Sequence, residues 1–193
     1  MVDLAHAVQA LLDARRTRRW LDDLPERARP QSEPDAYSIQ DHVAWNLGPV
    51  AGWKVGSETR DSEPFRASIH ASTLFIEQRR IAAAMFHIIG VEAEIAYSFA
   101  RDLPPEDAPY SREAVLDAIA SMHSAIEVVD TRFQTFGKVD PLVQRADQGN
   151  HGALVVGPGL QNWRDLNPAV QPVHLEIDGA SVCDTIGGNS AVE

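Results

Sequence analysis

Cysteine, cationic side chains and long apolar runs are the features that this sequence has least of. Cys183 is the single cysteine, which excludes an intrachain disulfide framework and predicts a small buried or half-buried side chain. The 17 Lys and Arg residues face 28 Asp and Glu residues, and the net charge of -11 argues against nucleic acid and anionic membranes as partners. Any anionic substrate would therefore need a local cation. No apolar run is long enough for a signal peptide or a membrane helix, so we expect a cytoplasmic protein.

The first part of the chain carries two helical patterns and a strand. Apolar residues recur at helical spacing over residues 4–19 and again over residues 35–47. The arginines that end the first pattern complement the helix dipole and are predicted to form a solvated face. Residues 50–56 (VAGWKVG) are typical of a short strand. We therefore predict an N-terminal helical and strand segment over residues 1–65.

The second part of the chain is mostly β-like. Residues 91–99 (VEAEIAYSF) alternate with period two inside an apolar region, which predicts a buried strand. Residues 110–126 place apolar side chains at intervals of four, three and four after an N-cap at Ser111, which predicts a helix packed on a sheet. Asp178 and Gly179 between two alternating runs predict a two-residue hairpin. Buried strands are also predicted at residues 126–133 and 152–159.

Two glutamates interrupt the apolar strand at residues 91–99. Residues two apart on a strand project to the same face, so Glu92 and Glu94 point together, with Cα atoms about 6.6 Å apart. Glu127 lies 33 residues after Glu94, behind the predicted helix, which would act as a crossover back to the same sheet. Three carboxylates suit Mg²⁺ or Mn²⁺, which prefer oxygen ligands. The alternative is that these glutamates form salt bridges or lie on a solvated sheet face.

Lys54 stands between two apolar residues of its predicted strand. It either extends to solvent or is held in a site. In a site that binds a dianionic substrate within this acidic protein, its ammonium group would supply the local cation that the substrate needs. Burial would also lower its pKa enough for proton transfer.

Polar residues before the predicted strand at residues 152–159 form a second group of candidates. Asp147, Gln148 and Asn150 lie in a loop there and are candidates for substrate contacts, and His151 is either a catalytic contact or a surface loop histidine. His70 could act as a general base or could be an ordinary packed histidine. Asp130 is out of phase with Glu127 and should face the other way unless the strand ends there.

Five motifs in this order resemble the 2-keto-4-pentenoate hydratase branch of the fumarylacetoacetate hydrolase superfamily. They are DAYSIQ, GWKVG, VEAEIAYSFARDLP, AIEVVDTR and GNHGALVVGPG. The resemblance implies an α+β fold, a mixed β roll or barrel preceded by a small helical and strand segment, in a homo-oligomer. In these terms residues 66–193 would form the catalytic β-roll domain, which is incomplete, after the segment over residues 1–65. It also implies that Glu92, Glu94 and Glu127 bind Mg²⁺ or Mn²⁺, and that Lys54 is the active-site lysine.

The implied activity is that of a hydro-lyase acting on a small 2-hydroxydienoic or 2-oxo acid. The acid would chelate the metal ion, which would polarise its keto group and stabilise an enolate. A C-C hydrolase or a 2-oxo acid decarboxylase on the same scaffold is the nearest alternative. A noncatalytic subunit in complex with a pathway partner is the alternative of a different class.

The sequence departs from the family pattern in two places. Residues 57–72 (SETRDSEPFRASIHAS) do not match the segment that carries substrate contacts in typical hydratases, so the substrate stays open. The chain ends at TIGGNSAVE, before the helix and strands that complete the family's barrel. We therefore expect a barrel truncated at its C-terminus, which needs a partner, a rearranged edge or a missing remainder to cover its edges.

Overall fold

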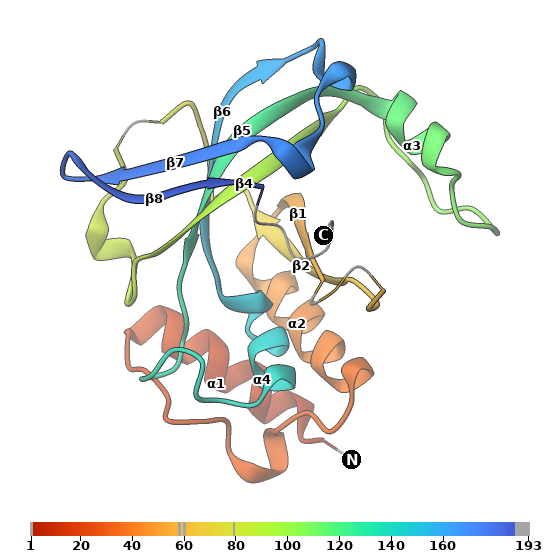
Figure 1. Ribbon diagram of the computed structural model, residues 1–193. Coiled ribbons are helices and arrows are strands. Elements are labelled where there is room, and N and C mark those ends of the chain that lie inside the picture. The colour runs from red at the N-terminus through yellow and green to blue at the C-terminus, as the bar shows by residue number, and fades with distance from the viewer. Residues whose placement is uncertain (1, 58, 60, 79, 188–193) are drawn as a thin grey trace.

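A computed structural model of the chain describes residues 2–57, 59, 61–78 and 80–187. Its strands stand above a layer of helices (Figure 1). The helices are α1 (Leu4–Thr17), α2 (Glu33–Leu47), α3 (Arg112–Ala118) and α4 (Pro141–Ala146). The strands are β1 (Val50–Gly56), β2 (Phe65–His70), β3 (Leu74–Ile76), β4 (Gly90–Phe99), β5 (Ile119–Val129), β6 (His151–Leu160), β7 (Pro172–Ile177) and β8 (Ala180–Ile186). Among the described residues, no helix has both the length and the apolar character needed to cross a membrane.

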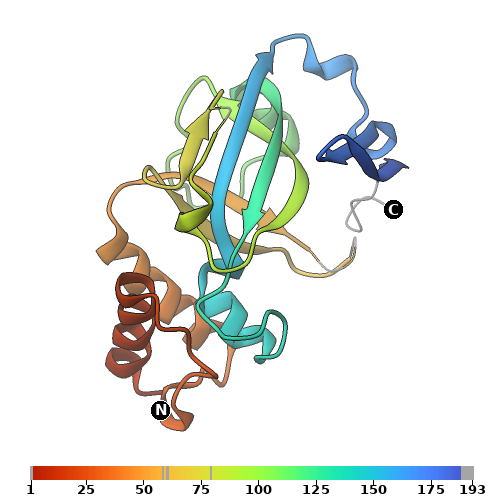
Figure 2. The ribbon, with the colours of Figure 1, turned by 90° about the vertical axis from the view of Figure 1, so that its left-hand side faces the viewer.

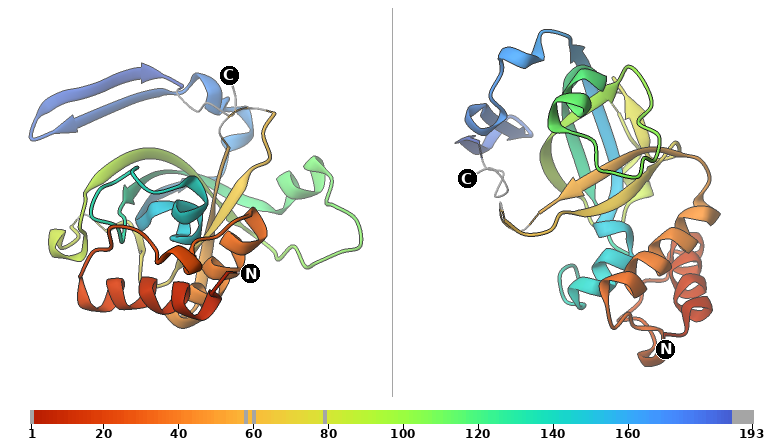
Figure 3. Two further views of the ribbon diagram at one scale, coloured as in Figure 1. Left: turned by 90° about the horizontal axis from the view of Figure 1, so that it is seen from below. Right: turned by 90° about the vertical axis from the view of Figure 1, so that its right-hand side faces the viewer.

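The strands form a mixed arrangement, as the predicted α+β fold requires. The largest sheet has the order β3-β6-β5-β4, in which β3 runs parallel to β6 and the other neighbours are antiparallel. Figure 2 shows β4, β5 and β6 side by side as a curved sheet. β1 pairs with β2, so strand pairing crosses the predicted boundary between residues 65 and 66. The predicted hairpin is confirmed as β7 and β8, which lie to one side of the large sheet (Figure 3).

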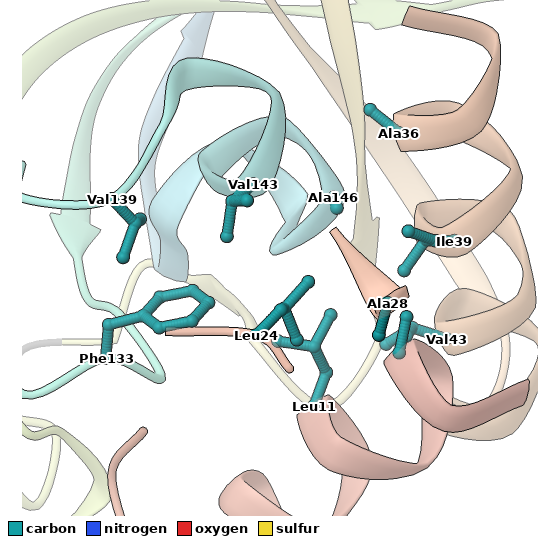
Figure 4. Close-up of a cluster of buried hydrophobic side chains, with 11 residues drawn as sticks. Leu11, Leu24, Ala28, Ala36, Ile39, Val43, Phe133, Val139, Val143 and Ala146 are labelled. Carbon is teal, nitrogen blue, oxygen red and sulfur yellow. The ribbon is translucent and has the colours of Figure 1, made fainter. Parts of the chain in front are cut away.

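The largest buried apolar cluster lies among the helices and not within the sheet (Figure 4). α1 and α2 match the two predicted helical segments, and each begins at a side-chain cap. Asp3 accepts a hydrogen bond from the backbone of His6, and Ser32 accepts one from the backbone of Asp35. α4 packs against α2 and completes the layer. The cluster contains Ala7, Leu11, Leu24, Ala28, Ala36, Ile39, Val43, Phe133, Val139, Val143 and Ala146.

The helix predicted over residues 110–126 is correct only in its first half. α3 begins after Ser111, whose hydroxyl accepts from the backbone of Ala114 as predicted, and it ends at Ala118. From Ile119 the chain becomes β5 instead. Met122 and Ile126, four residues apart, share a face of the strand, but the interval of three puts Ile119 and Met122 on opposite faces, so the apolar stripe by itself favoured a helix. Pairing with both β4 and β6 decides for the strand.

The connection between the two acidic strands also differs from the prediction. β4 and β5 are adjacent and antiparallel, so the crossover helix predicted between Glu94 and Glu127 is wrong. α3 lies within a long connection between neighbouring strands and does not carry the chain to a distant strand. An antiparallel pair needs no crossover, because the chain only has to reverse direction.

Two expectations about burial are wrong. β4 is an edge strand, and Glu92, Glu94 and most of its apolar residues are exposed where a buried strand was predicted. Cys183 lies on β8 and is exposed, although a buried or half-buried side chain was predicted. Both strands have the apolar composition of a covered strand. Over the described residues, however, β4 pairs only with β5, and β8 pairs only with β7.

Candidate metal centre and adjoining cavity

Three glutamate side chains converge on one face of the large sheet. Glu92 lies directly opposite Glu127 in the β4–β5 register, and Glu94 lies opposite Ala125. Directly opposed residues of an antiparallel pair share a face. One carboxylate oxygen from each of the three glutamates lies within 4.8 Å of the other two. The face predicted for Glu92 and Glu94 is therefore the observed one, and Glu127 joins them from the neighbouring strand.

Lys54 lies against this group and not in solvent. Its Nζ lies 2.7 and 2.6 Å from the two carboxylate oxygens of Glu127 and 3.2 Å from the carbonyl oxygen of Gly149. The Lys54 side chain is 16% exposed, whereas Trp53 and Val55 on the opposite face of β1 are 54% and 69% exposed. Of the two alternatives for Lys54, extension to solvent does not hold, and the ammonium group is paired with Glu127.

His151 is the second partner of Glu127. Its Nδ1 donates to Glu127 Oε1 at 3.0 Å, and its Nε2 lies 3.0 Å from the hydroxyl of Thr73. The side chain is buried, so the alternative of a surface loop histidine does not hold. The pKa of His151 is lowered, because burial first, and then the charges of Lys54 and Arg132, outweigh the hydrogen bond and charge of Glu127, which raise it. The ring is therefore neutral near pH 7, with its proton on Nδ1.

The charges of the group leave room for a cation. Burial acts to raise the pKa of Glu127, but hydrogen bonds from His151 and Lys54 and the Lys54 charge outweigh it, so this pKa is lowered. The pKa of Glu94 is raised, first by partial burial and then by the charges of Glu127 and Glu92. Three carboxylates and one ammonium group leave two negative charges unbalanced, which a divalent cation would balance. The oxygen donors suit Mg²⁺ or Mn²⁺, so these residues fit the predicted ion.

A cavity of about 220 Å³ adjoins the far side of His151. His70, Gln148 and His151 line it, together with Arg15 and Arg132. The three glutamates and Lys54 do not take part in its lining. Two groups of predicted site residues thus stand out. The acidic group consists of Glu92, Glu94 and Glu127 together with Lys54. His70 and Gln148 line the polar cavity, and His151 belongs to both groups.

His70 is held by protein contacts at both ring nitrogens. Its Nδ1 donates to the carbonyl oxygen of Gly48 at 3.0 Å. Its Nε2 therefore accepts from the amide of Gln148 at 2.9 Å, and it also lies 3.2 Å from the hydroxyl of Ser68. The predicted general base is thus a buried part of the cavity wall, and a base role would require Gln148 to give up its hydrogen bond.

Asp147 is the centre of a buried charge network. Its carboxylate accepts from Arg132 Nε at 2.6 and 2.9 Å and from Arg15 Nη2 at 3.1 Å. The predicted solvated face is therefore wrong for Arg15, whose side chain is only 19% exposed. Burial, and then the charge of Arg132, lowers the pKa of Arg15 to about 9. Arg15 and Arg132 were not among the predicted site residues. Arg15 does continue the apolar spacing of its helix, which is the one signal of its burial that the sequence offers.

The remaining two candidates lie next to this network. The side-chain amide of Asn150 donates to the side chain of Gln144 at 3.0 Å. The backbone carbonyl oxygen of Asn150 accepts from the backbone nitrogen of Asp130 at 2.9 Å. Asp130 follows the end of β5, so the strand phase no longer fixes its direction. Its carboxylate accepts from the backbone nitrogens of His87 and Ile88 at 2.9 and 2.8 Å, and it lines the cavity.

Comparison with known proteins finds likeness in structure but not in sequence. No family model matches the sequence, and a search of curated proteins finds no match. Two solved structures of 4-oxalocrotonate decarboxylase from Pseudomonas putida G7 resemble the fold. The one complexed with magnesium and adipate has a TM-score of 0.82 at 18% identity, over 97% of this chain and 74% of that chain. The one complexed with calcium and acetate has a TM-score of 0.80 at 16% identity, with the same shares. This likeness confirms the predicted fold class, an α+β fold of the fumarylacetoacetate hydrolase type.

Proposed function

We propose that the chain is a divalent-metal-dependent lyase that acts on a small 2-oxo or 2-hydroxydienoic acid. The observation that carries this proposal is the convergence of Glu92, Glu94 and Glu127 within 4.8 Å, beside the ammonium group of Lys54. Magnesium in one of the two similar solved structures also supports it. Mg²⁺ or Mn²⁺ at these carboxylates would supply Lewis acidity toward a keto oxygen, which favours the enol form of a 2-oxo acid.

The residues around the ion have separate tasks in this proposal. Glu92, Glu94 and Glu127 would hold it, and the hydrogen bond from His151 would fix the orientation of the Glu127 carboxylate. Lys54 would stabilise negative charge on the substrate or carry a proton to it, by turning an N–H group from its contacts with Glu127 and Gly149 toward a bound acid. His70 and Gln148 stay candidates for catalysis or substrate binding from the neighbouring cavity wall. Asp147 and Asn150, which do not line the cavity, stay candidates for substrate binding.

Hydratase activity is the first candidate reaction. A 2-hydroxy-2,4-dienoate would take the keto form, and water would then add across its remaining conjugated double bond. Decarboxylation is the second candidate, because both similar solved structures are of a decarboxylase. There the same enol-stabilising site would accept the electrons left by departing CO₂. A homo-oligomer and a cytoplasmic location stay predictions, as does a pathway partner.

A thermal-shift titration with Mn²⁺ and oxalate tests the site before any substrate is known. Oxalate imitates the enolate of a 2-oxo acid and binds through the ion. At about 100 times its dissociation constant, such a ligand stabilises the folded state by roughly 2.7 kcal/mol. We expect oxalate to stabilise the protein only when Mn²⁺ is present, and Glu94→Ala to abolish the shift. Glu113→Ala, which removes an exposed glutamate from α3, is the control and should keep it.

The outcomes separate the candidate functions. No stabilisation by Mn²⁺ with oxalate, in a protein that is folded by circular dichroism, would refute the proposed enzyme and favour the noncatalytic subunit. If the shift occurs, product analysis distinguishes the reactions. A dienoic acid converted to its hydrated 2-oxo product identifies a hydratase, and CO₂ released from a 2-oxo diacid identifies a decarboxylase.

A further inference from the structure

The cavity beside His151 lies behind the strand pair that carries Lys54. Lys54 is directly opposite Ala67 in the β1–β2 register, so these two side chains share a face. His70 follows Ala67 by three residues on β2 and therefore projects to the other face. His70 lines the cavity, whereas Lys54 does not. A ligand in the cavity would thus lie away from the three glutamates.

Arginine side chains make this cavity positively charged, although the protein has a net charge of -11. Arg15, Arg18 and Arg132 line it, and Asp130 is the one acid among its described lining residues. Asp147 is buried next to the cavity and accepts from Arg15 and Arg132. Three guanidinium groups therefore face two carboxylates, which leaves one positive charge for a ligand to balance.

Arg15 has donors left over for such a ligand. Its Nη2 donates to Asp147 at 3.1 Å and to Gln148 at 2.9 Å, which holds the guanidinium group in place. Its other two nitrogens have no acceptor among the described residues, and Nε is fully enclosed. Burial, and then the charge of Arg132, lowers the pKa of Arg15 to about 9, so the group is charged at pH 7. An anionic oxygen would give it the acceptor that its surroundings lack.

Arg18 forms the outer rim of the cavity. It donates to the backbone carbonyl oxygens of Ala84 and Phe86, so its position is fixed without a ligand. Arg18, Ser72 and Met85 are exposed lining residues, so the cavity opens to solvent between them. A ligand could therefore enter without unfolding any element of the wall, and it would meet cations that are already in position.

The remaining wall of the cavity is largely apolar. Trp20, Leu47, Met85 and Phe86 contribute to it, and Trp20 is held by stacking on His87, with ring centroids 4.3 Å apart. The volume of about 220 Å³ equals that of roughly seven water molecules at about 30 Å³ each. Pockets for drug-sized ligands start at roughly 300 Å³, so the occupant is smaller than these. The lining suits one anionic group joined to one compact apolar body.

We infer that this cavity is a second ligand site, which binds a small monocarboxylic acid with a compact apolar body. The carboxylate would lie against Arg15 and Arg18, and the apolar body against Trp20 and Phe86. A single carboxylate supplies the one negative charge that the arginines leave unbalanced. The site needs no metal ion, so this inference goes beyond the proposed function and does not depend on it.

Binding of benzoate to the metal-free protein tests this site. Isothermal titration would compare benzoate with benzamide, which has nearly the same shape but no charge, and with acetate, which lacks the apolar body. The variants are Arg18→Gln at the exposed rim and Arg15→Gln in the wall. Arg19→Gln, which removes an exposed arginine outside the cavity lining, is the control for charge. Glu94→Ala is the control for binding at the acidic group.

We expect benzoate to bind at least about tenfold more tightly than benzamide or acetate, as one charge-assisted hydrogen bond would provide. Arg18→Gln should weaken benzoate binding about fivefold, as expected for one partly solvated charge, and leave benzamide binding unchanged. Arg15→Gln should abolish the preference for benzoate. Arg19→Gln and Glu94→Ala should bind as the wild type does. If Arg15→Gln does not fold, Arg18→Gln decides by itself.

Three results would overturn the assignment. Equal affinity for benzoate and benzamide, or no binding of benzoate at millimolar concentration, would mean that the cavity is not an anion site. Unchanged benzoate affinity in Arg18→Gln would place the ligand elsewhere. Loss of benzoate binding in Glu94→Ala would place it at the acidic group. The titration with Mn²⁺ and oxalate would still decide the proposed function separately, because no metal is present in this experiment.

Discussion

Replacing Lys54 with Met tests the ion pair at the centre of the site. The change keeps the length of the side chain and removes its charge, leaving Glu127 with a 3% exposed side chain and His151 as its remaining hydrogen-bond donor among the described residues. Removing one partner of a buried ion pair costs about 3–5 kcal/mol, because the other charge stays buried without compensation. For a chain of this length, that predicts a fall in Tm of about 6–20 °C.

The same variant separates a structural role from a metal-binding one. Loss of the ammonium group raises the unbalanced charge of the three glutamates, so Mn²⁺ should restore more stability to Lys54→Met than it adds to the wild type. Turnover of any substrate should be lost while Mn²⁺ binding is kept. Differential scanning calorimetry with and without Mn²⁺ measures the loss of stability and its recovery on metal binding, and product analysis measures turnover.

The other lysine of the chain provides the control. Lys138 is exposed, so Lys138→Met should change Tm little. If Lys54→Met were as stable as Lys138→Met without metal, the contact between Lys54 and Glu127 would not be a stabilising pair. If Mn²⁺ stabilised the wild type and Lys54→Met equally, the charge argument for a cation at the three glutamates would be refuted.

Three further predictions follow from the core, the buried network and the surface. Asp147→Asn should cost about 3–5 kcal/mol in urea denaturation because Arg15 and Arg132 would lose their buried carboxylate, and a loss within the 1 kcal/mol typical of surface pairs would contradict the network. Leu11→Ala should cost about 2–5 kcal/mol by the same measurement, since the side chain is fully buried among the helices, and a smaller loss would mean that the helical layer is loosely packed. Cys183 should react with a thiol reagent as fast in the native protein as after denaturation, and protection in the native state would show that β8 is covered in solution.

Local patterns in the sequence determined the parts of the site that depend on one segment at a time. The period of two along residues 91–99 placed Glu92 and Glu94 on one face, because alternation is a property of any extended strand. The two N-terminal helices and the hairpin at Asp178 and Gly179 followed from equally local signals. Asp178 and Gly179 both have positive φ, the backbone conformation that this pair of residue types favours in a two-residue hairpin.

Family resemblance supplied what the local patterns did not. Grouping Lys54 with the three glutamates required knowledge of motifs far apart in the chain, since Lys54 and Glu127 are separated by 73 residues. The resemblance also suggested the fold class that the comparison with solved structures confirms. It did not suggest Arg15 or Arg132, whose contacts with Asp147 join distant segments of this chain.

Only the tertiary structure decided the places where long-range contacts override a local pattern. The apolar spacing through Ile119 favours a helix, but pairing on both sides selected the strand for β5. Arg15 reads as the polar end of a helix until Asp147, 132 residues away, is placed against it. Exposure of β4 likewise depends on which elements cover it, and not on its own residues. Hydrophobic periodicity reports the face that a segment would bury, whereas long-range pairing and charge neutralisation determine which partner it meets there.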